Sequence, residues 1–181
     1  EFAVRRYHPH VIARVRRGDG VKDNAAFNLL ATYIGVYGTP KNQGRRPIAM
    51  TAPVISYTPE RIAMTAPVVS KGDSDMAFVL PSEYKSKSDA PQPTDPRVEL
   101  VDVPERLVAV KVFSGWVDYN SSQQIAAKFK TELEEYGLKQ KSDSWQLAQY
   151  NPPFTLWLLR TNEIWVDIEH DSDYMKGPDE V

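Results

Sequence analysis

The chain has 181 residues, with 22 lysines and arginines against 24 aspartates and glutamates, and it has no cysteine. A net charge of −2 creates no strong field, so we do not expect nucleic acid as a partner. The absence of cysteine excludes disulfides, thiolate metal sites and a cysteine nucleophile, and it is compatible with a reducing compartment. No apolar run reaches the roughly 18 residues that a membrane span needs.

The first half of the chain, residues 2–80, is predicted to contain a strand, a helix and further strands. Residues 2–16 read as a strand interrupted at Pro9, because apolar and polar side chains alternate beyond the proline. A helix is predicted from about residue 23 or 24 to residue 36, and residues 76–80 form another strand. Between them, one seven-residue sequence occurs twice.

The repeated sequence is Ile-Ala-Met-Thr-Ala-Pro-Val, at residues 48–54 and again at residues 62–68. In each copy the larger apolar side chains fall on one face of an extended chain. Residues 58–61 read as a turn. We therefore predict that the two copies pair as adjacent antiparallel strands.

The second half, residues 98–169, repeats the order of elements. Strands are predicted at residues 98–103, 107–113, 145–150 and 164–169, and a helix at residues 121–136. Ser121 and Gln124 have the spacing of a capping box, and Gly137 suits the end of this helix. The polar, proline-rich stretch 81–96 is expected to connect the halves within one domain over residues 1–169, followed by a polar tail over 170–181.

Two segments carry more apolar surface than one sheet can cover. On the first helix, the apolar side chains span about 220° of the circumference. They pack against a loop or partner, or they hold a flat apolar ligand. After the rigid pair Pro152-Pro153, residues 154–159 are apolar on both faces, which fits either a buried strand or a loop that closes over a hydrophobic ligand.

Three blocks occur in an order that resembles the SOUL haem-binding family. They are the doubled Ile-Ala-Met-Thr-Ala-Pro-Val sequence, residues 78–84, and Tyr150-Asn151-Pro152-Pro153 followed by residues 160–165. The resemblance runs from residue 2 to residue 169 and is greatest to plant and algal soluble members. It implies an α+β fold, a distorted antiparallel β-barrel of two pseudo-repeated strand–helix–strand–strand halves flanked by two helices.

The resemblance also implies that haem and other tetrapyrroles bind in an apolar groove between the first helix and the loop after Pro153. Carried onto this chain, the groove is lined by Phe27, Leu30, Ala31, Ile34, Phe154, Leu156, Trp157 and Leu158. The position that matches a proposed histidine ligand in one family member holds Arg6, which cannot bind iron. His8 and His10 remain as structural histidines, a haem ligand or another metal site, so the metal ligand is unknown.

We expect a non-catalytic carrier or buffer of haem or another tetrapyrrole, which would have protein partners in haem metabolism. The alternative is a small-molecule hydrolase, which is an enzyme, or an effector-binding domain; both would be of the gyrase-inhibitor-like barrel type. That alternative needs a buried carboxylate, for which Glu163 and Glu169 are candidates by position. A protein-interaction module that uses the apolar helix face is a third hypothesis. We expect a cytoplasmic location, or a plastid location if a transit peptide has been removed.

Overall fold

A computed structural model describes residues 1–16, 23–57, 75–151 and 155–169 of the chain. The strands in these residues are β1 (Ala3–Tyr7), β2 (His10–Val15), β3 (Val54–Tyr57), β4 (Asp75–Val79), β5 (Val98–Val103), β6 (Arg106–Phe113), β7 (Gln146–Gln149) and β8 (Asn162–Ile168). The helices are α1 (Asp23–Ile34), α2 (Tyr119–Glu135) and the short 3-10 helix η1 (Trp157–Leu159). Among the described residues, the sequence thus predicted the type and order of these elements correctly, apart from η1 and the strand expected over residues 48–54.

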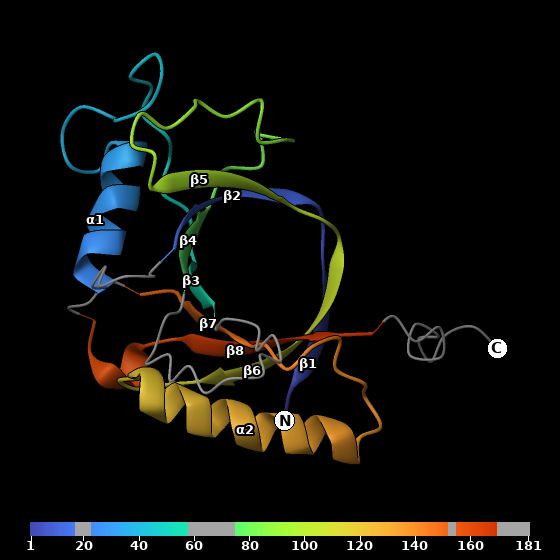
Figure 1. Ribbon diagram of the computed structural model, residues 1–181. Helices are drawn as coiled ribbons and strands as arrows, with labels where there is room; N and C mark the ends of the chain where they lie inside the picture. The colour runs from blue at the N-terminus through green and yellow to red at the C-terminus, as the bar shows by residue number, and fades with distance from the viewer. Residues whose placement is uncertain (17–22, 58–74, 152–154, 170–181) are drawn as a thin grey trace, which may run out of the picture.

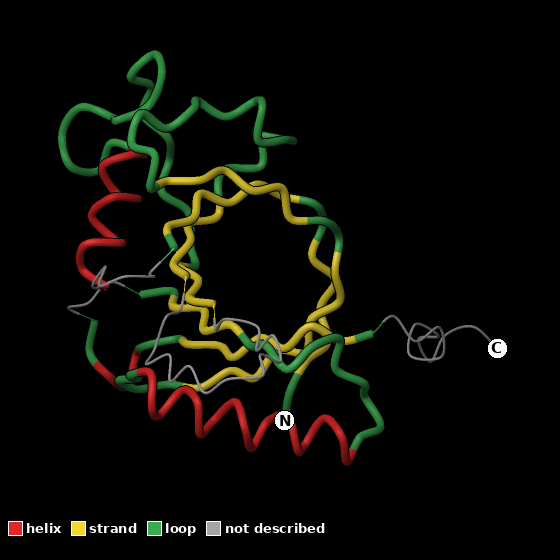
Figure 2. Tube along the Cα trace, in the orientation of Figure 1, coloured by secondary structure: helices red, strands yellow, loops and turns green. Residues whose placement is uncertain are grey.

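All eight strands form one antiparallel sheet in the order β1-β6-β8-β7-β3-β4-β2-β5. The sheet curls into a ring (Figures 1 and 2). Only His8 and Pro9 separate β1 from β2, and only Pro104 and Glu105 separate β5 from β6. These two short connections bring both ends of the sheet together, which forces the curl. The fold is therefore α+β and barrel-like, as expected.

The two halves use the same pairing order, since β6-β8-β7 in the second half matches β2-β4-β3 in the first. Helix α1 packs on β2 and β4, and α2 packs on β8. That the halves superpose as a structural repeat stays a prediction.

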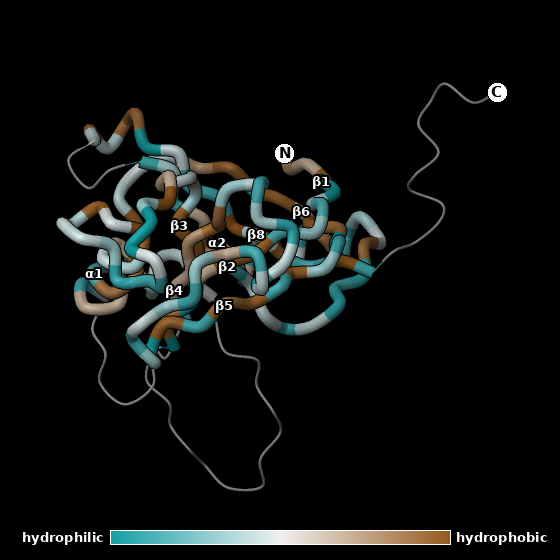
Figure 3. The backbone as a smooth tube through the Cα atoms, turned by 90° about the horizontal axis from the view of Figure 1, so that it is seen from above, coloured by the Kyte–Doolittle hydropathy of each residue, from teal (hydrophilic) through white to brown (hydrophobic). Residues whose placement is uncertain are grey.

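Hydrophobic side chains lie on both faces of the sheet. Outside the ring, Phe129 and Leu133 of α2 pack on Ile164 and Val166 of β8. Inside the ring, the buried cluster consists of Ile55, Val108, Val110, Ala148 and Trp165. Figure 3 shows where hydrophobic residues occur along the chain, with hydrophobic stretches on strands such as β6. Because side chains alternate along β8, Trp165 faces inward while its neighbours contact α2.

Helix α2 begins two residues earlier than predicted, and its cap is a different pair. Asp118 is the N-cap: its carboxylate accepts a hydrogen bond from the Ser121 backbone amide at 2.8 Å. The Ser121 hydroxyl oxygen accepts one from the Asp118 amide at 3.0 Å. The predicted capping box of Ser121 and Gln124 is therefore wrong, because an aspartate is available one turn earlier. Gly137 follows the helix with a φ of 74°, as expected for a residue that ends it.

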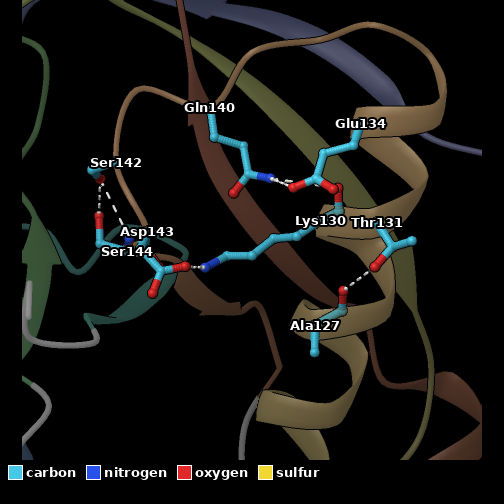
Figure 4. A network of polar contacts seen from close by, with 8 residues as sticks. All are labelled: Ala127, Lys130, Thr131, Glu134, Gln140, Ser142, Asp143 and Ser144. Carbon is cyan, nitrogen blue, oxygen red and sulfur yellow. Dashed lines mark hydrogen bonds and ion pairs between the residues drawn. The ribbon is translucent and has the colours of Figure 1, made fainter.

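Side chains fix the C-terminal half of α2 to the loop that leads into β7 (Figure 4). The Lys130 ammonium lies 2.6 Å from a carboxylate oxygen of Asp143, and Gln140 donates to the Lys130 carbonyl at 3.4 Å. Ser142 and Ser144 are joined by a hydrogen bond of 2.6 Å. These polar contacts add to the apolar packing of Leu138 and Trp145 against α2.

The first copy of the repeated sequence does not form the predicted strand. Residues 48–53 have no regular structure, and β3 starts only at Val54. Pro53 has no amide hydrogen for a strand ladder, and the bond before it is cis. The second copy, residues 62–68, lies outside the described residues. Residues 48–53 therefore do not form the predicted strand pairing with the second copy, and β3 itself pairs with β4 and β7.

Residues 81–96, the connector between the two halves, cover part of helix α1. The Tyr33 hydroxyl donates to the Pro91 carbonyl at 2.8 Å, and Ala90 is buried in the same core as the helix. The Gln43 amide donates to the Gln92 carbonyl at 2.8 Å. Residues 81–96 therefore form a wall over the helix. This wall covers part of the wide apolar arc of α1, which agrees with packing against a loop, one of the two explanations open from the sequence.

Candidate functional site

The helix residues predicted to line a groove lie mostly in the core. Leu30 and Ala31 are 0% exposed and Ile34 is 2% exposed. Phe27 is half-buried, with its ring centroid 5.3 Å from that of Phe78. Leu30, Ala31 and Ile34 therefore do not line an open groove in this structure, because the connector and the sheet cover them.

The loop residues have the opposite environment. Leu156, Trp157 and Leu158 are exposed by 69%, 54% and 65%, and Leu159 by 68%. Phe154 lies outside the described residues. Four consecutive large apolar side chains in water are unusual for a surface and typical of a binding site. The structure thus favours the ligand-binding loop over the buried strand, the other explanation of this segment.

A fifth exposed side chain belongs to the same surface. Trp116 is 65% exposed, and the guanidinium carbon of buried Arg160 lies 3.8 Å from its ring centroid. The side-chain amide of Asn162, the first residue of β8, donates to the Gly115 carbonyl at 2.9 Å, which ties the start of β8 to the loop that carries Trp116. We refer to Trp116 and residues 156–159 as the apolar end surface. In Figure 1, the loop that carries η1 lies below α1, on the same side of the barrel in this view.

Sequence reasoning missed Trp116 and Arg160. Trp116 stands in a short segment between β6 and α2, and neither element's periodicity includes it. The available signal was a tryptophan directly after Gly115, between a predicted strand and a predicted helix. Arg160 was noted only as part of a family motif.

The base of the loop is a continuation of the β7–β8 pairing. The Tyr150 amide donates to the Thr161 carbonyl at 3.2 Å, and the Thr161 amide donates to the Asn151 side chain at 2.6 Å. The Arg160 Nε donates to the Thr155 carbonyl at 3.2 Å. Hydrogen bonds thus join the two ends of the loop, at residues 150–151 and 161, and also join Thr155 to Arg160 within it.

Of the two candidate carboxylates, Glu163 is buried and Glu169 is exposed. Glu163 faces the inside of the barrel, where Oε1 accepts from Arg5 Nη1 at 2.9 Å. Its other oxygen, Oε2, accepts from the Tyr150 hydroxyl and from Trp165 Nε1, both at 2.7 Å. Burial, and then the bond to Glu163, raise the pKa of Tyr150. The hydrogen bond to Tyr7, and then the pairing with Glu163, raise the pKa of Arg5.

The described histidines lie far from the apolar end surface. His8 follows β1 at the end where Tyr7 pairs with Arg106, whereas Trp116 and Arg160 adjoin the end where Phe113 pairs with Asn162. Seven residue steps of β6 separate these ends, or about 23 Å. A haem on the apolar end surface is therefore out of reach of His8.

The histidines also have local roles. The His8 side chain is 84% exposed, with Nδ1 3.7 Å from a Glu105 oxygen. His10 Nδ1 is 2.8 Å from the His8 carbonyl, and burial lowers the pKa of His10. Within the described ranges, no three histidine, aspartate or glutamate side chains are placed to hold a metal ion. His170 lies outside those ranges.

A separate pocket lies on the outer side of α1. Its volume is about 330 Å³, and its wall includes Asn28, Leu29, Lys41 and the turn at residues 95–98. Asp95 accepts from Arg97 at 2.7 and 2.9 Å, and these hydrogen bonds lower the pKa of Asp95 to about 2. The pocket is polar at its rim, unlike the apolar end surface.

The fold places the chain in a class, the curled antiparallel barrels with two flanking helices. The C-terminal domain of EcmrR has this fold, with a TM-score of 0.60 at 14% identity over 93% of this chain and 97% of that one. An uncharacterized conserved protein from Listeria innocua gives 0.57 at 12% identity over 92% of both chains. A hydrolase from Listeria innocua gives 0.54 at 12% identity over 92% of this chain and 91% of that one. At these identities the likeness shows the fold alone.

The sequence identifies the family within this class. The chain belongs to the SOUL heme-binding protein family, whose sequence profile matches residues 1–167. No curated protein shows significant similarity to the chain. Among the described helices, none is both long and apolar enough to cross a membrane.

Proposed function

We propose that this protein binds haem and related tetrapyrroles on the apolar end surface and acts as a non-catalytic carrier or buffer. The observation that carries the proposal is the run of four exposed apolar side chains, residues 156–159, beside exposed Trp116. Membership of a haem-binding family supports the ligand class. A porphyrin is flat and apolar, and its stacking on tryptophan and leucine side chains removes both surfaces from water.

The proposed surface differs from the groove predicted from the sequence. Leu156, Trp157 and Leu158 belong to it, and Phe154 adjoins it in the chain. Leu30, Ala31 and Ile34 support α1 from the core instead. Among the four helix residues predicted to line the groove, Phe27 alone is partly exposed.

Apolar contact supplies enough free energy for useful affinity. Each large apolar side chain that the ligand covers contributes about 1.5–3 kcal/mol, part of which is offset by the cost of association. Micromolar affinity needs about 8 kcal/mol net. Five side chains can reach this value without a bond to iron. Loosely ligated haem is easy to release, which suits a carrier or buffer.

The geometry gives less support to the enzyme alternative. Glu163 is the buried carboxylate that an enzyme of this fold would need, but both of its oxygens accept hydrogen bonds from neighbouring side chains. A general base needs a free oxygen that reaches the proton it removes. We therefore place Glu163 outside the proposed tetrapyrrole site.

The cysteine-free composition is compatible with the proposed cytoplasmic location.

A titration of the native protein tests the proposal. Haemin and metal-free protoporphyrin are added separately, and binding is followed by Soret absorbance and tryptophan fluorescence. Saturable binding of both, with dissociation constants within about tenfold of each other, is expected because apolar contact dominates. Binding of haemin alone would indicate that iron ligation dominates, and binding of neither would refute the proposal.

A further inference from the structure

The buried carboxylate of Glu163 is held unequally by its neighbours. Its Oε2 accepts two hydrogen bonds, from Tyr150 on the β7 side and from Trp165 on β8 itself. Its Oε1 accepts from Arg5 alone among the described residues. Removal of Arg5 would therefore leave the carboxylate in place, with one oxygen still fixed and the other unpaired.

Arg5 is the half of the pair that can leave. It lies on β1, which stands at the end of the strand order and pairs with β6 alone among the described strands. Its side chain is 41% exposed, whereas that of Glu163 is 5% exposed. The guanidinium can turn into water, where it is well hydrated, whereas the carboxylate on a central strand would stay buried, so the pair opens only when another cation replaces Arg5.

Whatever replaces Arg5 must be a cation. A buried carboxylate without a positive partner is strongly unfavourable, so an anion or a neutral molecule would not compensate for the lost guanidinium. The surrounding side chains are aromatic: the Tyr7 ring centroid lies 4.7 Å from that of Trp165, and Tyr150 is hydrogen-bonded to the same carboxylate. Aromatic rings beside a carboxylate favour organic cations over hydrated metal ions.

We propose that Glu163, Tyr150, Trp165 and Tyr7 form a second binding site, for an organic guanidinium or amidinium cation that takes the place of Arg5. Arg5 itself shows the chemistry that fits, because its guanidinium donates to Oε1 at 2.9 Å. A planar amidinium offers the same N–H donors and a flat apolar body to lie against the rings. The site lies inside the barrel and does not depend on the proposed tetrapyrrole surface.

Benzamidine is the probe, and calorimetry measures its affinity for the intact chain and three variants. Arg5→Ala removes the competing guanidinium and is expected to bind benzamidine at least tenfold more tightly than the native protein. Adding Glu163→Gln in that background is expected to lower the affinity at least tenfold again. Arg6→Ala is the matched control, because Arg6 is the next residue on the same strand and faces the other way. Its affinity should equal that of the native chain.

Benzamide, which has the same shape without the charge, should not bind to any variant. Equal benzamidine affinity in Arg5→Ala and native protein, or in Arg5→Ala with and without Glu163→Gln, would overturn the proposal. Circular dichroism first shows which variants fold. If the Arg5 variants do not, the Trp165 indole N–H resonance of the native protein decides: a saturable shift with benzamidine and not with benzamide supports the site, and no shift overturns it. Haemin binding is measured separately, so either proposal can fail alone.

Discussion

The guanidinium carbon of Arg160 lies 3.8 Å from the ring centroid of Trp116, so a buried cation supports an exposed aromatic ring. Arg160 belongs to the loop that precedes β8, and Trp116 belongs to the loop that precedes α2. A cation over a ring at this distance is worth about 0.5–2 kcal/mol. The contact therefore fixes the ring in the orientation that presents its other face to solvent.

Arg160→Gln is expected to weaken haemin binding through Trp116 rather than directly. Without the guanidinium, the ring loses its preferred orientation, and we expect a three- to tenfold weaker affinity, or about 0.7–1.4 kcal/mol. Arg160→Lys, which keeps the charge, should recover part of the loss. Time-resolved anisotropy of tryptophan fluorescence should show faster local motion in Arg160→Gln. Unchanged affinity in both variants would show that this contact does not position Trp116 for binding.

Removal of a described histidine is expected to leave haemin binding nearly unchanged. His8 lies at the opposite end of β6 from the apolar end surface, about 23 Å away along the strand. His8→Ala should therefore change the dissociation constant by less than twofold, and the Soret maximum should stay in place. A large loss of affinity with His8→Ala would place the haem at the other end of the barrel.

Leu30 and Leu158 should respond oppositely to truncation. Leu30→Ala leaves a cavity in the core and should lower the free energy of unfolding by about 2–5 kcal/mol. Leu158→Ala removes a side chain that is already in water, so stability should change by less than about 0.5 kcal/mol. Urea unfolding measures both. If Leu158→Ala proves as destabilising as Leu30→Ala, the loop is packed in solution and the apolar end surface does not exist as described.

The stability of the protein should fall as His10 becomes protonated. Burial lowers the pKa of His10 below its ordinary value of 6.5, so the folded chain binds fewer protons than the unfolded chain near this pH. Since stability rises with pH wherever the unfolded state binds more protons, the free energy of unfolding should decrease as pH drops through about 6.5. His10→Gln should reduce this slope between pH 7.5 and 5. An identical slope in both proteins would mean that His10 is not the group responsible.

The sequence predicted the strands and helices because their signals are local. The apolar face of α2 was confirmed. In β2, Val11, Ala13 and Val15 are buried as the alternation predicted, but Ile12 on the other face is buried as well. Which distant segment packs over an apolar face cannot be predicted from the residues of that face alone. The arc on α1 has the composition of a ligand groove, but Pro91 and its neighbours fold over it, and periodicity alone carries no information on that contact.

The same limit explains the candidate site. Residues 156–158 were identified because an apolar run without alternation is visible in one segment. Trp116 joins them only through Arg160, which comes from a distant part of the chain. The partners of Glu163 come from β1, from β8 and from Tyr150 directly after β7. Its burial was therefore predicted as a condition for an enzyme and not as a specific contact.

The central claim is that the apolar end surface binds the tetrapyrrole, and a comparison of two variants tests it most directly. Trp157→Ser combined with Leu158→Ser removes two exposed apolar side chains from that surface, whereas Tyr37→Ser removes one that is 56% exposed beyond the C-terminal end of α1. Haemin titration should give an affinity at least 30-fold lower for the double variant, or about 2 kcal/mol, and an unchanged affinity for Tyr37→Ser. Equal affinity of the folded double variant and the native protein would contradict the account.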